Sequence, residues 1–175
     1  MSVRCLTVAA ILVAQGLALS FLETLLPLPT PVPGAKLGLA NAVTLAALYT
    51  LPRQRDVLLV SVLRVVLASF FCGGPSLLLY SLSGALGSLA VMLLLKRRGV
   101  SLISVSAAGG LAHNLCQLGT AMLVLHSSAL LSLLPLLSLA GLAAGWGIGV
   151  LGKGLAQRLQ AHESYVLSAC CQKQL

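Results

Sequence analysis

Long runs without a charged residue constrain this chain more than any other feature of its sequence. No Asp, Glu, Lys or Arg occurs in residues 5–22, 65–95 or 99–152. A soluble domain has about a quarter of its residues charged, whereas 8% are charged here and 58% are apolar. Since such a chain cannot cover a soluble fold with charged surface, the sequence predicts a membrane protein.

The uncharged runs and the breaks between them predict an all-α fold, a polytopic bundle of six transmembrane helices. One span takes about 20 residues, and the run at 99–152 has room for two spans and a turn. The breaks are the alternating prolines at 27–33, then Pro52, Gly73-Gly74-Pro75 and Lys96-Arg97-Arg98-Gly99. A single domain is expected over 1–158, with a short cytoplasmic tail at 159–175. The predicted spans are 3–26, 37–51, 56–71, 76–95, 101–125 and 129–158, with Pro135 either kinking or starting the last.

The basic residues predict how the bundle is oriented. With six spans, the termini share a side with the second and fourth connections. That side collects Arg4, Arg53, Arg55, Lys96, Arg97, Arg98, Lys153, Arg158 and Lys173, whereas the other side has Lys36. Because cytoplasmic loops are enriched in Lys and Arg, both termini are expected in the cytoplasm.

Composition also excludes several functions. The chain has three carboxylates, Glu23, Asp56 and Glu163, and they are far apart in the sequence. They cannot form the acidic clusters that hold Mg²⁺ against a diphosphate, so no catalysis, metal or cofactor is expected. The net charge of +8 is spread between apolar segments, which argues against nucleic acid as a partner.

Two small-residue patterns have competing interpretations. Residues 147–153 match phosphate-binding patterns, but no predicted strand precedes them and no acid is placed to help hold Mg²⁺. Gly141, Gly145 and Gly149 instead share one helix face, which predicts close packing against another helix. A similar face made of Ala10, Ala14 and Ala18 serves either packing inside the bundle or docking to a second membrane protein.

Polar side chains inside the apolar helices are the candidate functional residues. Burying the Arg64 guanidinium costs about 2.5–3.5 kcal/mol even on the insertion scale. A structural ion pair between Arg64 and Glu23, with a satisfied core histidine, would explain each residue singly. Together the polar groups predict one cavity for an anionic or zwitterionic small molecule, open to the outside beneath the proline-rich loop. The proposed binding residues are Glu23, Lys36, Asn41, Arg64, His113, Asn114 and Gln117.

The segment Pro33-Gly34-Ala35-Lys36-Leu37-Gly38-Leu39-Ala40-Asn41 resembles the P-G-x-K-L-G-L-A-N signature of the Gx transporter family, also labelled heptaprenyl diphosphate synthase component I. Supporting matches are Glu23, Leu63-Arg64, Tyr80-Ser81-Leu82 with Gly84, and Ala112-His113-Asn114 with Gln117. The likeness covers residues 6–158.

That family is similar to the substrate-binding (S) components of energy-coupling factor transporters. The resemblance implies a bacterial cytoplasmic membrane protein that docks on a transmembrane T component through Ala10-x-x-x-Ala14, with two cytoplasmic ATPases driving transport. It also implies that loop 27–36 closes over the solute.

The expected function is uptake of a small solute by a non-catalytic subunit in the lipid bilayer. The family's other label leaves open a non-catalytic membrane accessory of a heptaprenyl or polyprenyl diphosphate synthase. A structural or assembly role is a third alternative.

Overall fold

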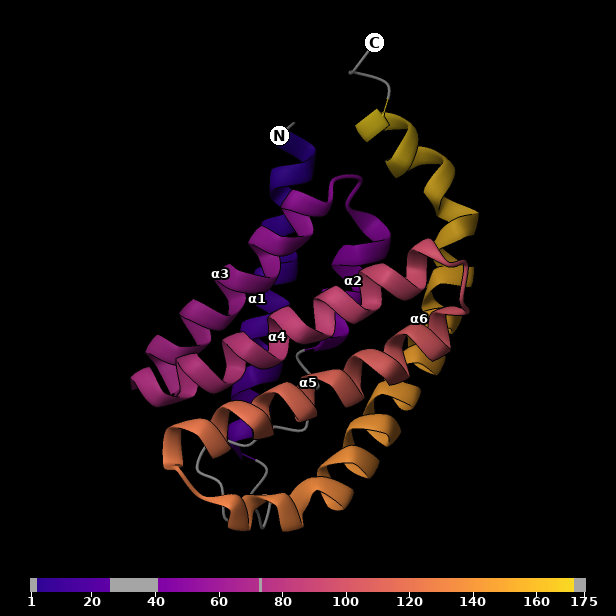
Figure 1. The fold of residues 1–175 in the computed structure, drawn as a ribbon. Helices are drawn as coiled ribbons and strands as arrows, with labels where there is room; N and C mark the ends of the chain where they lie inside the picture. Colours follow the sequence, from indigo (N-terminus) through magenta and orange to yellow (C-terminus); the bar gives the residue numbers. More distant parts are fainter. Residues whose placement is uncertain (1–2, 26–40, 73, 172–175) are drawn as a thin grey trace.

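The computed structural model describes the backbone of residues 3–25, 41–72 and 74–171, and the side chains of 3–25, 41–71 and 78–154. These residues form helices and turns, with no strand among them. The helices are α1 (Val3–Leu25), α2 (Asn41–Thr50), α3 (Gln54–Cys72), α4 (Gly74–Arg97), α5 (Leu102–Leu125) and α6 (Leu134–Cys171), with a short 3₁₀ helix, η1 (Ser128–Leu133), before the last (Figure 1). The prediction of six helices is confirmed.

Most helix ends lie where the sequence placed its breaks. α2 ends two residues before Pro52. α4 is stopped at Gly99, whose φ is +72° and whose N–H donates to the Lys96 carbonyl at 3.1 Å, while the Val100 N–H donates to the Leu95 carbonyl at 3.2 Å. A glycine in the left-handed region with this bonding ends a helix without strain. α5 then begins after Ser101, whose side chain accepts a hydrogen bond from the Ser104 N–H.

Two helices differ in extent from the predicted spans. The described α2 covers Asn41–Thr50, and the predicted start at residue 37 lies outside the described part. α6 starts at Leu134, so Pro135 lies in its first turn, where the missing N–H costs no hydrogen bond. The helix then continues past 158 to Cys171 into the segment predicted as a tail.

Helices that follow one another in the sequence mostly pack side by side. α5 lies between α4 and α6, and α3 lies between α1 and α4. The short α2 is central and contacts all five other α-helices. Six of its ten residues are buried, and its Leu45 and Leu48 belong to the main apolar core.

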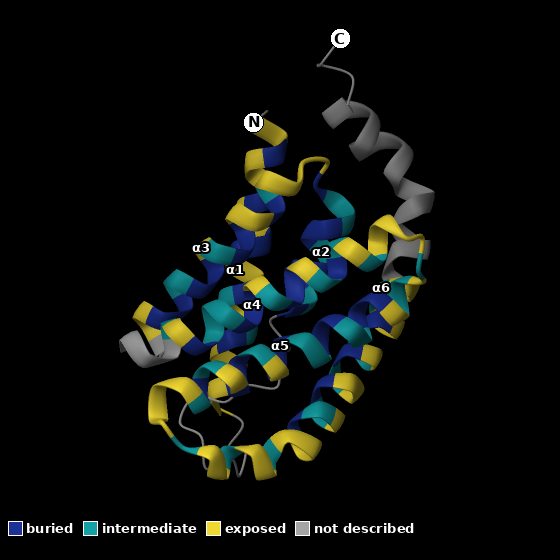
Figure 2. Cartoon of the chain, viewed as in Figure 1, coloured by how far each residue is buried: buried dark blue, intermediate teal, exposed yellow. Residues whose placement is uncertain are grey.

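The outer faces of the helices are apolar and exposed, while the buried residues face inward (Figure 2). Among the described residues, three helical segments are long and apolar enough to cross a membrane: Val3–Leu25, Leu78–Arg97 and Ser128–Gly154. The molecule is therefore a membrane protein whose described part is all-helical. That all six helices cross the bilayer stays a prediction.

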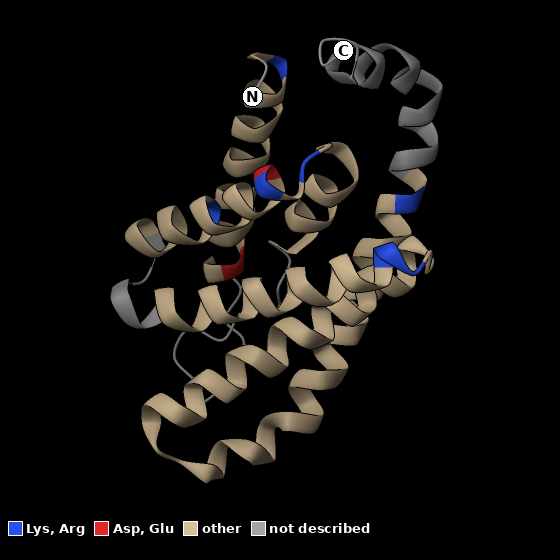
Figure 3. Ribbon diagram, turned by 45° about the horizontal axis from the view of Figure 1, so that its top comes forward, with Lys and Arg blue, Asp and Glu red and all other residues tan. Residues whose placement is uncertain are grey.

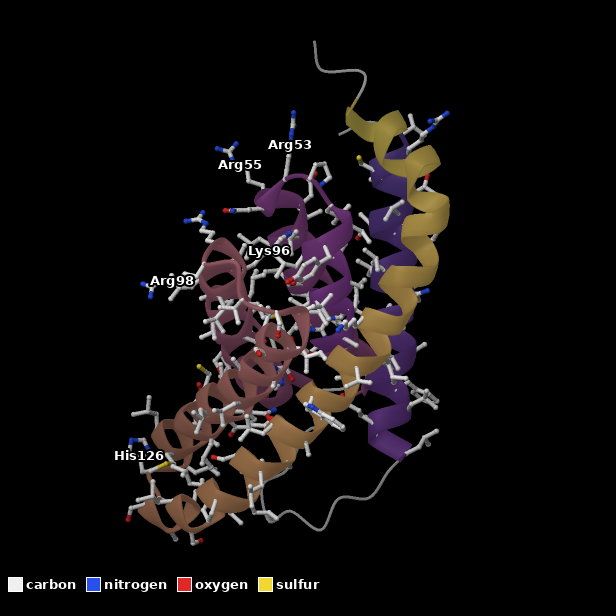
Figure 4. The ribbon with its side chains drawn as sticks, turned by 90° about the vertical axis from the view of Figure 1, so that its right-hand side faces the viewer. Arg53, Arg55, Lys96, Arg98 and His126 are labelled. Carbon is white, nitrogen blue, oxygen red and sulfur yellow. The ribbon has the colours of Figure 1, made fainter. Side chains whose placement is uncertain are left out.

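Lys and Arg residues gather toward one end of the molecule (Figure 3). Arg53, Arg55, Lys96 and Arg98 lie toward this end, and His126 lies at the opposite end (Figure 4). The beginning of α1 and the end of α6 lie toward the same end (Figure 1). The second and fourth connections thus share one end of the bundle.

Candidate functional site

Polar side chains from five helices are buried inside this apolar bundle. Each is at most 6% exposed. We call ten of these residues the polar band; they are Ser20 and Glu23 of α1, Asn41 and Thr44 of α2, Ser61 and Arg64 of α3, Ser88 of α4, and His113, Asn114 and Gln117 of α5. Six of the seven predicted binding residues belong to it. The seventh, Lys36, and the proline-rich loop 27–36 lie outside the described residues.

Arg64 lies at the α1 side of the polar band. Its aliphatic stem fills the space beside Gly16, where an added Cβ would lie 2.7 Å from Arg64 Cγ and nearer still to Cδ. Its Nη2 donates to Thr44 Oγ1 at 3.4 Å, and the carboxylate of Glu23 attracts the guanidinium electrostatically. Gly16 and Glu23 are two turns apart and so lie on one face of α1, which is the face that borders Arg64.

The hydrogen bonding of Arg64 is incomplete among the residues that the structure describes. Nε is buried and has no partner there, and the bond to Thr44 is long. Thr44 Oγ1 is shared, because Ser61 Oγ also donates to it at 3.4 Å. A guanidinium carries five N–H donors, and a buried donor without a partner costs about 1–3 kcal/mol. This end of the polar band is therefore suited to an anionic acceptor.

Side chains of α2 and α4 extend the polar band from Arg64 toward α5. Asn41 lies one turn from Thr44 on α2, and its Oδ1 accepts a hydrogen bond of 3.0 Å from Ser88 Oγ on α4. One turn before Ser88, Gly84 leaves room for the imidazole of His113: a Cβ there would lie 3.0 Å from its Nδ1. The polar band thus includes a hydrogen bond between α2 and α4 and a packing contact between α4 and α5.

Asn114 lies at the far end of the polar band. Its Nδ2 donates to the Leu137 carbonyl of α6 at 2.8 Å, and Gly141 makes room for this contact, since a Cβ there would lie 2.9 Å from Nδ2. A carbonyl only accepts, so this bond fixes which way the amide is turned. Oδ1 therefore faces away from Leu137, buried and without a hydrogen-bond partner in the described part of the chain.

The glycines of α6 are packing residues, as predicted. A Cβ at Gly141 would lie 2.7 Å from the Gly110 carbonyl oxygen, and one at Gly145 would lie 2.5 Å from that of Ser106. A Cβ at Gly149 would lie 2.8 Å from Ile103 Cα. All three neighbours are on α5, so the two backbones touch along this face. The phosphate-binding patterns of 147–153 fall inside α6, with no strand before them in the described chain.

The alanine face of α1 points away from the bundle. Ala10, Ala14 and Ala18 are all exposed, as is Gln15 among them. The face therefore lies on the outer surface, although the sequence left packing inside the bundle as an alternative. Docking to a second membrane protein through this face stays a prediction.

At the basic end, Lys96 links α4 to the end of α2. Its Nζ donates to the Leu48 carbonyl at 2.6 Å and lies 4.5 Å from the ring centroid of Tyr49. Arg97 donates to Gln54 Oε1 at 2.9 Å. Among the described residues, no group of three His, Cys, Asp or Glu is placed to hold a metal ion.

Sequence reasoning missed the hydroxyls and the glycine that support the site. Ser61 lies one turn before Arg64, and Thr44 lies one turn after Asn41, so helical spacing from the predicted residues could have found both. Nothing in the sequence indicated that Gly16 borders Arg64, because this contact is between two helices.

Comparison with known proteins gives one match. The model of the family described as heptaprenyl diphosphate synthase component I matches residues 12–155. This range contains the polar band and the glycine face of α6, and it leaves out Ala10. No curated protein and no solved structure matches the chain.

Proposed function

The chain belongs to the heptaprenyl diphosphate synthase component I family, and since a component is part of a larger assembly, we propose that it is a non-catalytic membrane subunit whose polar band binds a small anionic or zwitterionic solute. The proposed ligand residues are Arg64, His113, Asn114 and Gln117, with Glu23, Lys36 and Asn41 near the mouth.

The observation that carries this proposal is the buried Arg64 side chain with its Nε unpartnered among the described residues. A charged residue inside a membrane protein is costly and is found mainly where it faces a partner, a wet cavity or a substrate path. A guanidinium presents neighbouring N–H donors that bind a carboxylate or phosphate through two parallel hydrogen bonds. An oxyanion at Nε would complete the bonding that Thr44 supplies in part.

The role we favour is solute uptake. In this proposal all six helices span a bacterial cytoplasmic membrane, and the solute enters from the outer face beneath loop 27–36. The exposed alanine face of α1, with Gln15, docks on a transmembrane T component as in the substrate-binding components that the sequence resembles. Cytoplasmic ATPases then drive release inward, and this chain hydrolyses nothing itself.

The orientation in this proposal follows from the basic end of the molecule. Arg53, Arg55 and Arg98 lie at that end, which we place in the cytoplasm together with both termini. Protease digestion of intact spheroplasts tests this. Epitope tags at either terminus should survive until the cells are opened, whereas cleavage of a terminal tag in intact spheroplasts would reverse the orientation.

The uptake experiment is Arg64→Ala in cells that depend on this protein for the solute. We expect uptake to be lost while the amount of protein in the membrane is unchanged, because the oxyanion loses its cationic partner. Arg98→Ala is the matched control, since Arg98 is exposed at the basic end. Unchanged uptake by Arg64→Ala would remove Arg64 from the site.

The family description favours a second candidate, a membrane accessory of a heptaprenyl or polyprenyl diphosphate synthase. A prenyl diphosphate is also an oxyanion, and the chain's three carboxylates leave the Mg²⁺ chemistry to another subunit. A gentle-detergent pulldown followed by mass spectrometry separates the two. Recovery of a T component and ATPases would support transport, whereas recovery of a prenyl synthase subunit with polyprenyl diphosphate would support the accessory role.

A further inference from the structure

We infer that the bound solute carries a hydrogen-bond donor as well as an oxyanion, and that Asn114 selects for this donor. This inference rests on the proposed function, because it concerns the ligand of the polar band. It narrows the solute to zwitterions and to acids that also bear an amide, amine, hydroxyl or ring N–H group.

The orientation of the Asn114 amide supplies the first step. Its Nδ2 is held by the Leu137 carbonyl at 2.8 Å, and turning the amide over would set two acceptors against each other. Oδ1 must therefore remain the end directed away from α6. This oxygen is buried on a side chain that is only 1% exposed, so the group that meets it must be a donor.

The opposite end of the polar band, at Arg64, needs a hydrogen-bond acceptor from the solute. Arg64 Nε is a donor that lacks an acceptor among the described residues. Between them in the polar band, Asn41 and Ser88 share a hydrogen bond, and Gly84 packs against His113, the residue before Asn114. A solute bound in the polar band would offer an acceptor to Arg64 and a donor to Asn114.

The need for a donor at Asn114 Oδ1 also distinguishes between the two candidate functions. A fully ionised prenyl diphosphate has oxyanion acceptors and a hydrocarbon tail, and it carries no N–H or O–H donor for Asn114 Oδ1. A site built to bond a donor discriminates strongly against analogues that lack one, because its own polar atom is then left unpaired. Asn114 therefore favours a small donor-bearing solute.

The test uses the full-length protein purified in mild detergent and dialysed against a deproteinised small-molecule extract of the host cells. Mass spectrometry of the retained compounds compares the wild type with Asn114→Leu and Asn114→Ala. Ser69→Ala is the matched control, because Ser69 is buried but its hydroxyl bonds within its own helix, to the Val65 carbonyl at 2.8 Å.

We expect the wild type and Ser69→Ala to retain the same acid, bearing at least one N–H or O–H donor, and the Asn114 variants to retain about ten- to hundredfold less. A retained anion without any donor would overturn the inference even if neither variant folds. Equal retention by a folded Asn114 variant would overturn it as well, leaving the proposed function in place. A wild type that retains nothing would overturn the proposed function and this inference with it.

Discussion

Replacing Gly16 with alanine tests whether α1 sets the position of Arg64. The new Cβ would lie 2.7 Å from Arg64 Cγ, with Cδ nearer still, whereas carbon atoms in contact are about 3.5–4.0 Å apart. The arginine stem must therefore move by about 1 Å. The Nη2–Thr44 bond is already 3.4 Å long, so this movement would break it and displace Nε from its present position.

The expected magnitudes follow from these contacts. Loss of well-placed charge-assisted hydrogen bonds to a solute corresponds to about 1.5–3 kcal/mol, or roughly ten- to hundredfold in affinity. The stability change should be smaller, because crowding of about 1–3 kcal/mol is offset in part by the higher helix propensity of alanine, about 1 kcal/mol. Solute retention and thermal unfolding in detergent measure the two quantities.

Gly119→Ala is the control for this prediction. Gly119 also lies within a helix, but a Cβ there meets nothing within 4 Å. It gains the same helix propensity without touching the polar band. Equal solute retention by Gly16→Ala and Gly119→Ala would refute the reasoning that Gly16 positions Arg64.

Two further substitutions test the packing around the site. Gly145→Ala should lower thermal stability by about 1–3 kcal/mol, because its Cβ would meet α5 backbone at 2.5 Å. Gly147→Ala is the control and should not lower it, because a Cβ there meets nothing within 4 Å. Equal melting temperatures of the two variants would argue against close α5–α6 contact. Lys96→Met should cost about 0.5–1 kcal/mol through loss of the Tyr49 and α2 carbonyl contacts. Arg98→Met is its control in chemical unfolding, and a larger loss in that control would contradict the assignment.

Helix number and most helix ends could be predicted because the signals are local. Charged residues, prolines and glycines interrupt the apolar runs, and Gly99 and Pro52 act on the backbone beside them. The end of α6 could not be predicted this way. After Gly154 no glycine or proline occurs before the end of the chain, so nothing local stops the helix at 158, where the prediction assumed that a helix ends with the membrane.

The residues of the site were predictable to the extent that their chemistry contrasts with their surroundings. Arg64 and His113 stand out in apolar helices, and both are buried. Thr44, Ser61 and Ser88 do not stand out, because hydroxyls are common in such helices and often bond within their own turn. The room that Gly16 and Gly84 leave for Arg64 and His113 is a property of helix pairs, so it required the structure.

The helices differ in length and hydropathy, and this difference affects how the chain enters a bilayer during synthesis. α1 and the long segments of α4 and α6 are apolar enough to insert singly, but α2, α3 and α5 are not among the segments that qualify. The ten described residues of α2 reach about 15 Å, which is too short for them to insert alone into a hydrocarbon core of about 30 Å. α3 carries Arg64, which opposes insertion by about 2.5–3.5 kcal/mol. These helices must enter together with their neighbours, so the residues that make the site also make membrane insertion depend on folding.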